Sequence, residues 1–293
     1  MNITDVIPNF IFDNFSLCST NTEYDNFFNS AGFKILCFNI RSIQCNLDKF
    51  ILFINKHLKD IGIIILTETW YDNNAPYIFE IAGFNAQFSS IYINQNSGIA
   101  IYITKNLDAQ ITELNRFDKT NCFEINFKIN NDKIKIIAFY RTHDSNKNIF
   151  IEELDDFLSQ LNRADHYLII GDINIDILDE NDQHSLNYLN IIHSHNFLPC
   201  INQPTRVQIN ETRSTITQTC IDHILFKSTK LLDLNTAILK TDITDHYIVA
   251  ANLILNTQIH EKSTETFDKT IINYTTLNNC LMQENTGCHL ILT

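Results

Sequence analysis

Short apolar runs alternate with amphipathic stretches along most of the chain. Apolar residues at helical spacing, such as Leu47, Phe50 and Ile54, predict helices, whereas continuous or alternating apolar runs predict strands. The predicted helices are 46–58, 150–161 and 184–197, and the predicted strands are 33–40, 61–70, 97–103, 121–129, 133–140, 167–175, 219–226 and 246–255.

The order of these elements predicts the fold class. Helices alternate with buried strands early in the chain, and strands follow one another directly in its middle. This mixture favours an α/β (α+β) fold, a four-layer α/β/β/α sandwich of two packed mixed sheets flanked by helices. We predict one domain over residues 31–256, preceded by an irregular segment (1–30) and followed by a tail or linker (257–293). Without a Gly-rich phosphate loop, nucleotide binding of the Walker or Rossmann kind is not indicated.

Composition narrows the class of protein. Hydrophobic residues make up 44% of the 293 positions, enough for a substantial core. No apolar run approaches the roughly 18 residues that a membrane span needs, so no membrane partner is expected. The N-terminal residues lack the basic region of a signal peptide, and the 8 Cys include no Cys-x-x-Cys pair. We therefore expect an intracellular, monomeric protein with reduced thiols.

The formal net charge of −13 bears on possible ligands. An acidic chain is a poor polyanion binder by bulk electrostatics. A role on nucleic acid would therefore require a local group of basic residues, or metal ions, to offset that charge.

Several predicted strands have polar groups at their ends. An Asn or Asp beside a strand is most often a turn former, but a set of six such ends in one chain predicts a shared site. His223 would face the opposite side of its strand from Asp222, so we expect it to be structural. The members of the set are Asn39, Glu68, Tyr140 with Arg141, Asp172 with Asn174, Asp222, and Asp245 with His246.

These residue types match what phosphodiester hydrolysis requires. Mg²⁺ takes oxygen ligands and keeps some of its waters, so Glu68 and Asp245 would suffice to hold it. A histidine held by a carboxylate can donate a proton to a phosphoryl oxygen or assist the water, and Asp222 with His246 would form that pair.

The remaining groups would serve the water and the phosphate. Asp172 is a candidate base for the attacking water, with Asn174 orienting water or phosphate. Tyr140 can donate a hydrogen bond to an anionic oxygen. Three further candidate phosphate contacts are Asn39, Arg41 and Arg141.

The ordered motifs resemble the endonuclease/exonuclease/phosphatase superfamily, whose fold is like that of deoxyribonuclease I. They are "FNIRSI", "LTETW", "FYR", "GDIN", "TCIDHI" and "TDH", and they span roughly residues 33–255. The resemblance implies that Asn39 also lies against the metal and that Thr219 contacts the phosphate.

Within that superfamily, "LCFNIRSI", "LTETW" and "IDHILF" are similar to the endonuclease domain of non-LTR retrotransposons. This resemblance implies a Mg²⁺-dependent enzyme, with Mn²⁺ as an alternative ion, that nicks DNA and leaves a 3′-hydroxyl. It also implies a nuclear location and a reverse transcriptase domain downstream. The usual Tyr-Arg-Pro-Pro is "YRTH" here, which puts the loop after Tyr140 in question.

Two alternatives stay open. The same fold serves phosphatases and phosphodiesterases that act on RNA, inositol phosphates or lipids; the lack of a Lys/Arg cluster and of an export signal disfavours the last two. The second alternative is that the protein is a catalytically inactive remnant of a retrotransposon element, and the intact set of polar strand ends argues against it.

Overall fold

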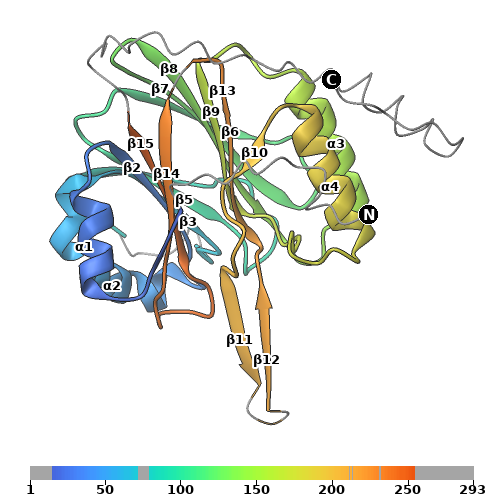
Figure 1. Cartoon of the computed structure of the whole chain (residues 1–293), viewed down its shortest axis with the longest axis horizontal. Coiled ribbons are helices and arrows are strands. Elements are labelled where there is room, and N and C mark those ends of the chain that lie inside the picture. The colour runs from blue at the N-terminus through green and yellow to red at the C-terminus, as the bar shows by residue number, and fades with distance from the viewer. Residues whose placement is uncertain (1–14, 72–78, 211, 213, 231, 255–293) are drawn as a thin grey trace, which may run out of the picture. The chain divides into compact units, whose positions relative to one another are not determined.

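The computed structural model describes residues 15–71, 79–210, 212, 214–230 and 232–254 (Figure 1). The expected tail over 257–293 lies outside them. The helices are α1 (Asn21–Asn29), α2 (Ile43–Ile54), the 3-10 helix η2 (Asn55–Asp60), α3 (Lys147–Ser159) and α4 (Gln183–Ser194). The strands are β1 (Phe15–Cys18), β2 (Phe33–Asn39), β3 (Ile61–Thr67), β4 (Phe84–Phe88), β5 (Ile99–Thr104), β6 (Ala109–Leu114), β7 (Thr120–Ile129), β8 (Asp132–Arg141), β9 (His166–Asp172), β10 (Leu198–Pro199), β11 (Arg206–Asn210), β12 (Thr215–Thr219), β13 (Asp222–Ser228), β14 (Asp233–Leu239) and β15 (Ile248–Ile254).

Two large mixed sheets pack face to face. The first has the strand order β1-β14-β15-β2-β3-β5-β4, and the second has the order β10-β13-β9-β8-β7-β6. Helices α1 and α2 cover the outer side of the first sheet, and α3 and α4 cover the outer side of the second (Figure 1). The predicted four-layer α/β/β/α sandwich is confirmed. None of the described helices is long and apolar enough to cross a membrane.

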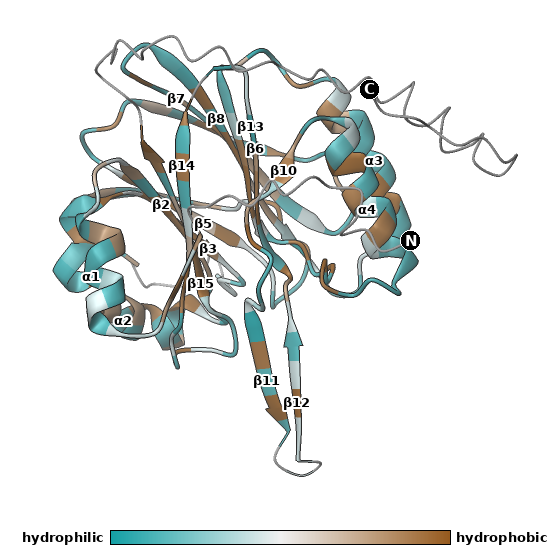
Figure 2. Ribbon diagram, viewed as in Figure 1, coloured by the Kyte–Doolittle hydropathy of each residue, from teal (hydrophilic) through white to brown (hydrophobic). Residues whose placement is uncertain are grey.

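The continuous apolar runs follow from burial on both faces. Side chains alternate across a strand, so β3 sends Ile63 and Ile65 into the core between the sheets and Ile64 toward the helices. On that side of the sheet, Ile64 belongs to the same hydrophobic cluster as Phe50 and Ile54 of α2. Helices α3 and α4 carry both polar and apolar positions, as Figure 2 shows, and their apolar residues form the outer core of the second sheet.

The N-terminal segment is more regular than predicted. Its described part, from residue 15, forms β1 and α1, and β1 pairs in parallel with β14. Thr20 and Glu23 form a reciprocal capping box at the start of α1. The expectation of an irregular segment is wrong for these residues because α1 buries only Phe27 and Phe28, which leaves little apolar periodicity to detect.

Strands β11 and β12 form a hairpin that extends away from the two sheets (Figure 1). Apolar and polar residues mix along both strands (Figure 2), and the cross-strand pair Ile209 and Ile216 is 66% and 64% exposed. The hairpin corrects the predicted strand 219–226: Thr219 ends β12, whereas β13 begins at Asp222.

Candidate active site

The sheet topology brings the predicted polar set to one edge of the sandwich. Strands β2 and β3 run in parallel, as do β8 and β9, so each pair ends at the same edge. The register places Tyr140 beside Asp172, and Asp172 beside Asp222 on β13. Strand β13 is antiparallel to β9 and β15 is antiparallel to β2, so both begin at the edge where their neighbours end.

Glycine is required before Asp172 because β9 lies close to β8. Gly171 has a φ of +150°, and a Cβ there would lie 1.9 Å from the carbonyl oxygen of Phe139. After the strand, Asn174 adopts a φ of +54°, and its backbone N–H donates to Asp172 Oδ1 at 3.1 Å. The "GDIN" motif thus ends a buried strand in a tight turn that fixes one carboxylate oxygen.

Asn39 joins the two sheets at this edge. Its Nδ2 donates to Glu68 Oε1 and to Asp172 Oδ2, both at 2.8 Å. Its Oδ1 accepts from the backbone N–H of Arg41 at 3.2 Å. The amide of Asn39 is fully buried, so it orients two carboxylates that come from different sheets.

His246 and Asp222 form a buried pair. His246 Nδ1 lies 2.9 Å from Asp222 Oδ2, and both side chains are 2% exposed. Burial alone would lower the pKa of His246, but the charge and hydrogen bond of Asp222, together with Asp172 and Asp245, raise it to about 9. The imidazole is therefore held in its charged form at neutral pH.

Thr205 completes this pair, and the sequence analysis missed it. Its hydroxyl donates to Asp222 Oδ2 at 2.7 Å and accepts from the backbone N–H of Asp222 at 3.1 Å. Thr219, predicted to contact the phosphate, is half-buried at the end of β12, where its carbonyl accepts from the N–H of Thr205; its contact with phosphate stays a prediction. No apolar strand precedes Thr205, so the strand-end rule could not select it.

Buried carboxylates crowd the centre of the site. Burial, followed by the charge of Asp222 and then that of Glu68, raises the pKa of Asp172 to about 7. Ligand atoms of Asp172, Asp222 and His246 lie within 4.8 Å of one another. A divalent cation would relieve this repulsion, and the oxygen-rich donor set fits Mg²⁺ or Mn²⁺.

Asp245, a predicted metal ligand, is held by two arginines. Its Oδ1 lies 2.5 Å from Arg41 Nη1, and its Oδ2 lies 2.8 Å from Arg206 Nε. Burial opposes ionisation, but Arg206, His246 and Arg41 lower the pKa of Asp245. The side chain of Arg41 is 43% exposed at the rim, and its predicted contact with phosphate stays a prediction. Arg206 has no counterpart in the predicted set.

Tyr140, a predicted hydrogen-bond donor, pairs with Asp172 in the register of β8 and β9. It is 3% exposed, and its hydroxyl donates to the carbonyl of Asn96 at 3.5 Å. Burial, and then the charges of Glu68 and Asp172, raise the pKa of Tyr140 well above its usual value. It therefore stays protonated and serves as a hydrogen-bond donor.

The prediction that Arg141 contacts phosphate is wrong. Arg141 is 1% exposed and points into the protein, where its guanidinium donates to the carbonyls of Ile173 (2.6 Å), Asn174 (2.7 Å) and Ser145 (2.8 Å). In return, Asn174 Nδ2 donates to the carbonyl of Arg141 at 2.6 Å. Arg141 thus stabilises the turn after β9, and its buried guanidinium is not accessible to a phosphate.

Replacing Arg141 by methionine is expected to lower the free energy of unfolding by about 3 kcal/mol or more, because buried carbonyls lose their donors. Urea unfolding would measure the change. The matched control is Arg163→Met, at an exposed arginine, where a change within about 0.5 kcal/mol is expected. Equal unfolding midpoints for both variants would contradict this role of Arg141.

The expectation for His223 agrees with the structure. Its ring is fully buried, with Nδ1 3.0 Å from the hydroxyl of Tyr188 and Nε2 3.1 Å from the carbonyl of Cys220. Burial lowers the pKa of His223 to about 4, so it is neutral. It packs on the helix side of the sheet, away from the pair of Asp222 and His246.

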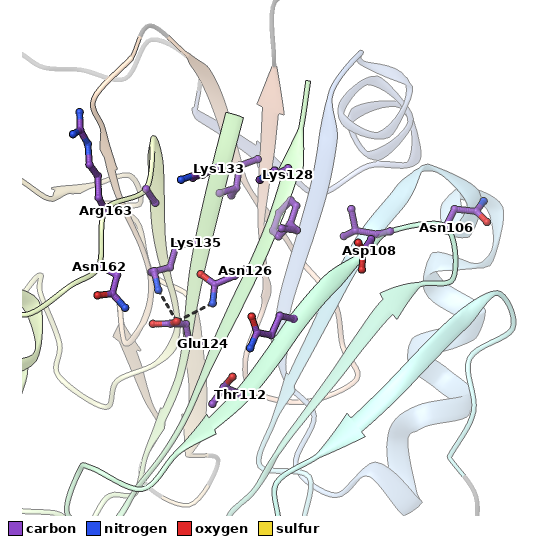
Figure 3. Close-up of a pocket in the computed structure, with 15 residues that line it drawn as sticks. Asn106, Asp108, Thr112, Glu124, Asn126, Lys128, Lys133, Lys135, Asn162 and Arg163 are labelled. Carbon is purple, nitrogen blue, oxygen red and sulfur yellow. Dashed lines mark hydrogen bonds and ion pairs between the residues drawn. The ribbon is translucent and has the colours of Figure 1, made fainter. Parts of the chain in front are cut away.

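A hollow in the described part of the chain lies away from this edge (Figure 3). It has a volume of 880 Å³ and is lined by β6, β7 and the start of β8. Lys135 and Glu124 form an ion pair at its floor. Lys133, on its rim, is seven residues from Tyr140 along β8, or roughly 23 Å. The polar edge is therefore separate from this hollow.

No protein-family model matches the chain, and no curated protein does either. Solved structures match its fold at low identity. The endonuclease domain of TRAS1, a telomere-specific non-LTR retrotransposon, is 13% identical with a TM-score of 0.56, over 76% of this chain and 99% of that domain.

One bacterial and one archaeal structure match to a similar extent. An endonuclease/exonuclease/phosphatase family protein from Leptotrichia buccalis is 12% identical with a TM-score of 0.55, over 76% of this chain and 100% of that one. An AP endonuclease from Archaeoglobus fulgidus is 18% identical with a TM-score of 0.53, also over 76% and 100%. The fold of this chain is therefore that of the endonuclease/exonuclease/phosphatase superfamily, as its motifs predicted.

Proposed function

We propose that the protein is a metal-dependent phosphodiester hydrolase that nicks DNA and leaves a 3′-hydroxyl. One observation carries this proposal: Glu68, Asp172 and the pair of Asp222 and His246 converge at one edge of the sandwich, although they are scattered over nearly 180 positions of the chain. Asn39 links Glu68 and Asp172 across the two sheets by hydrogen bonds of 2.8 Å.

A divalent ion, Mg²⁺ or Mn²⁺, would be held by Glu68 with help from Asp245 or Asp172. It would neutralise charge on the phosphate. Asn39 donates to two of these carboxylates, so in this arrangement its amide orients ligands, and its predicted direct contact with the metal stays a prediction.

Asp172 and His246 would serve as the proton acceptor and the charged hydrogen-bond donor of the reaction. Asp172, with a pKa raised to about 7 by burial and by Asp222, is suited to accept a proton from the attacking water near neutral pH. His246, charged below pH 9 beside Asp222, would donate a hydrogen bond to a phosphoryl oxygen. Tyr140 would act as a second donor, and Asn174 would orient the water or the phosphate.

DNA is the proposed substrate because the motifs resemble those of retrotransposon endonucleases and the TRAS1 endonuclease domain shares the fold. Arg41 and Arg206 supply local positive charge at the rim, although the chain as a whole has a net charge of −13. Action in the nucleus as a monomer, with a reverse transcriptase domain downstream in a complete element, belongs to the same proposal.

A nicking assay on supercoiled plasmid with Mg²⁺ tests the function. We expect His246→Gln to slow nicking by about 10²- to 10⁴-fold, because it removes the charged donor. His166→Gln is the control, since His166 is equally buried beside a carboxylate, that of Asp132, at the far end of β9. Inert DNA with turnover of RNA, or phosphate release from inositol or lipid substrates, would select the alternative substrates. No metal binding and no turnover would indicate an inactive remnant.

A further inference from the structure

The negative charge of Asp245 is balanced by two arginines in the absence of a metal ion. Both of its carboxylate oxygens are engaged, one by Arg41 and the other by Arg206, and its side chain is only 15% exposed. Each oxygen keeps a second lone pair, but the positive charge of the two arginines lowers the affinity of this carboxylate for a metal ion. The arrangement therefore sets the two arginines in competition with a divalent ion for Asp245.

Arg206 is also the first residue of the β11–β12 hairpin. Its backbone forms an isolated bridge with His246, and the N–H of Val207 donates to the carbonyl of Asp245 at 2.9 Å. The N–H of Tyr247 donates to the carbonyl of Thr205 at 2.7 Å. Backbone hydrogen bonds thus join the base of the hairpin, which Figure 1 shows extending from the sheets, to the Asp245–His246 segment.

We propose that Arg206 is a positioning residue that couples metal binding to DNA binding. Without DNA it pairs with Asp245 and weakens the site for a divalent ion. A DNA phosphate at the rim draws the guanidinium away, because phosphate is also a bidentate acceptor for arginine and the metal ion then balances the charge of Asp245 in its place. Asp245 is then released to the metal. This inference rests on the proposed function, since it takes the site to hold a cation against a phosphate.

If Arg206 couples the two kinds of binding, replacing it should have opposite effects on the affinity for a metal ion and the affinity for DNA. Removing the guanidinium leaves Asp245 with Arg41 alone and makes the site more negative by one charge, which favours a divalent cation. The same change removes one cation from the rim and weakens contact with the DNA backbone. A residue that only supported the fold would, when replaced, weaken both kinds of binding.

The experiment measures the two affinities separately in Arg206→Gln. Mn²⁺ binding without DNA is followed by titration calorimetry, and binding of a short DNA duplex in EDTA is followed by fluorescence anisotropy. We expect the Kd for Mn²⁺ to fall about three- to tenfold. We expect the Kd for DNA to rise about tenfold, with a salt dependence smaller by about one counterion.

Three variants make the result decisive. Arg206→Lys keeps the charge and should stay close to the wild type for Mn²⁺, and Arg163→Gln, at an exposed arginine outside the site, should change neither affinity. If Arg206→Gln fails to fold, Arg41→Gln tests the same competition from the other oxygen of Asp245.

The failure of each proposal has its own signature. A wild type that binds no Mn²⁺ overturns the metal site and the coupling together. A wild type that binds Mn²⁺ and nicks DNA, while Arg206→Gln binds Mn²⁺ with equal or lower affinity, overturns the coupling and leaves the proposed function standing.

Discussion

Replacing Asp172 by asparagine is expected to slow DNA nicking at least ~10³-fold, because the proposed base for water disappears and a carboxylate next to the metal is neutralised. The turn after β9 should survive, since asparagine has the same shape and its Oδ1 can still accept from the backbone N–H of Asn174; only the hydrogen bond from Asn39 to the other oxygen is lost. The loss of activity should therefore reflect chemistry and not unfolding.

The same substitution is expected to stabilise the metal-free protein. The pKa of Asp172 is raised to about 7 by burial and by Asp222, so the folded state keeps a proton that the unfolded state has lost between about pH 4 and pH 7. Stability of the wild type falls as pH rises through that window, and the cost is complete above pH 7. Asparagine removes the cost, which we put at roughly 1 to 3 kcal/mol.

Urea unfolding in EDTA at pH 5 and pH 8, beside the plasmid assay, would measure both effects. The gain of Asp172→Asn over the wild type should be larger at pH 8. Asp155→Asn is the control, because Asp155 pairs with His195 on the surface and its side chain is 51% exposed. Lower stability of Asp172→Asn at pH 8 would show that the carboxylate is not strained by its neighbours.

The central strands and most of the site could be predicted because both obey local rules. Continuous apolar runs such as those of β3 and β9 occur where a strand is covered on both faces. Glu68, Asp172 and His246 could be selected because each adjoins such a run. Strand β14 was not predicted, because polar residues such as the buried Thr236 interrupt its apolar pattern.

Other features depend on contacts that no local pattern contains. Arg141 ends β8 much as Glu68 directly follows β3, but the guanidinium of Arg141 turns inward to carbonyls of the loop after β9. Thr205 and Arg206 enter the site from the base of a hairpin, through contacts with Asp222 and Asp245. Sequence spacing does not tell which side of the edge a side chain will face.

Replacing Asp222 by asparagine is expected to move the alkaline limit of the nicking reaction. In the wild type, Asp222 raises the pKa of His246 to about 9 against the effect of burial. The ionised pair therefore stabilises the fold fully below the ordinary histidine pKa of about 6.5, and this contribution is lost as pH rises through 9. If the charged imidazole donates to the phosphoryl oxygen, kcat/KM should also fall near pH 9.

Without the carboxylate, burial dominates and the pKa of His246 should drop by about two units or more, because Asp172 and Asp245 only partly replace Asp222. The pH dependence of kcat/KM would show the alkaline decline displaced to near or below pH 7, with a lower maximum. Thr205→Val is the matched control: it removes the hydroxyl that donates to Asp222 Oδ2 but keeps the charge, so the decline should stay close to pH 9. A decline at the wild-type pH in Asp222→Asn would mean that His246 is not the group whose proton the reaction requires.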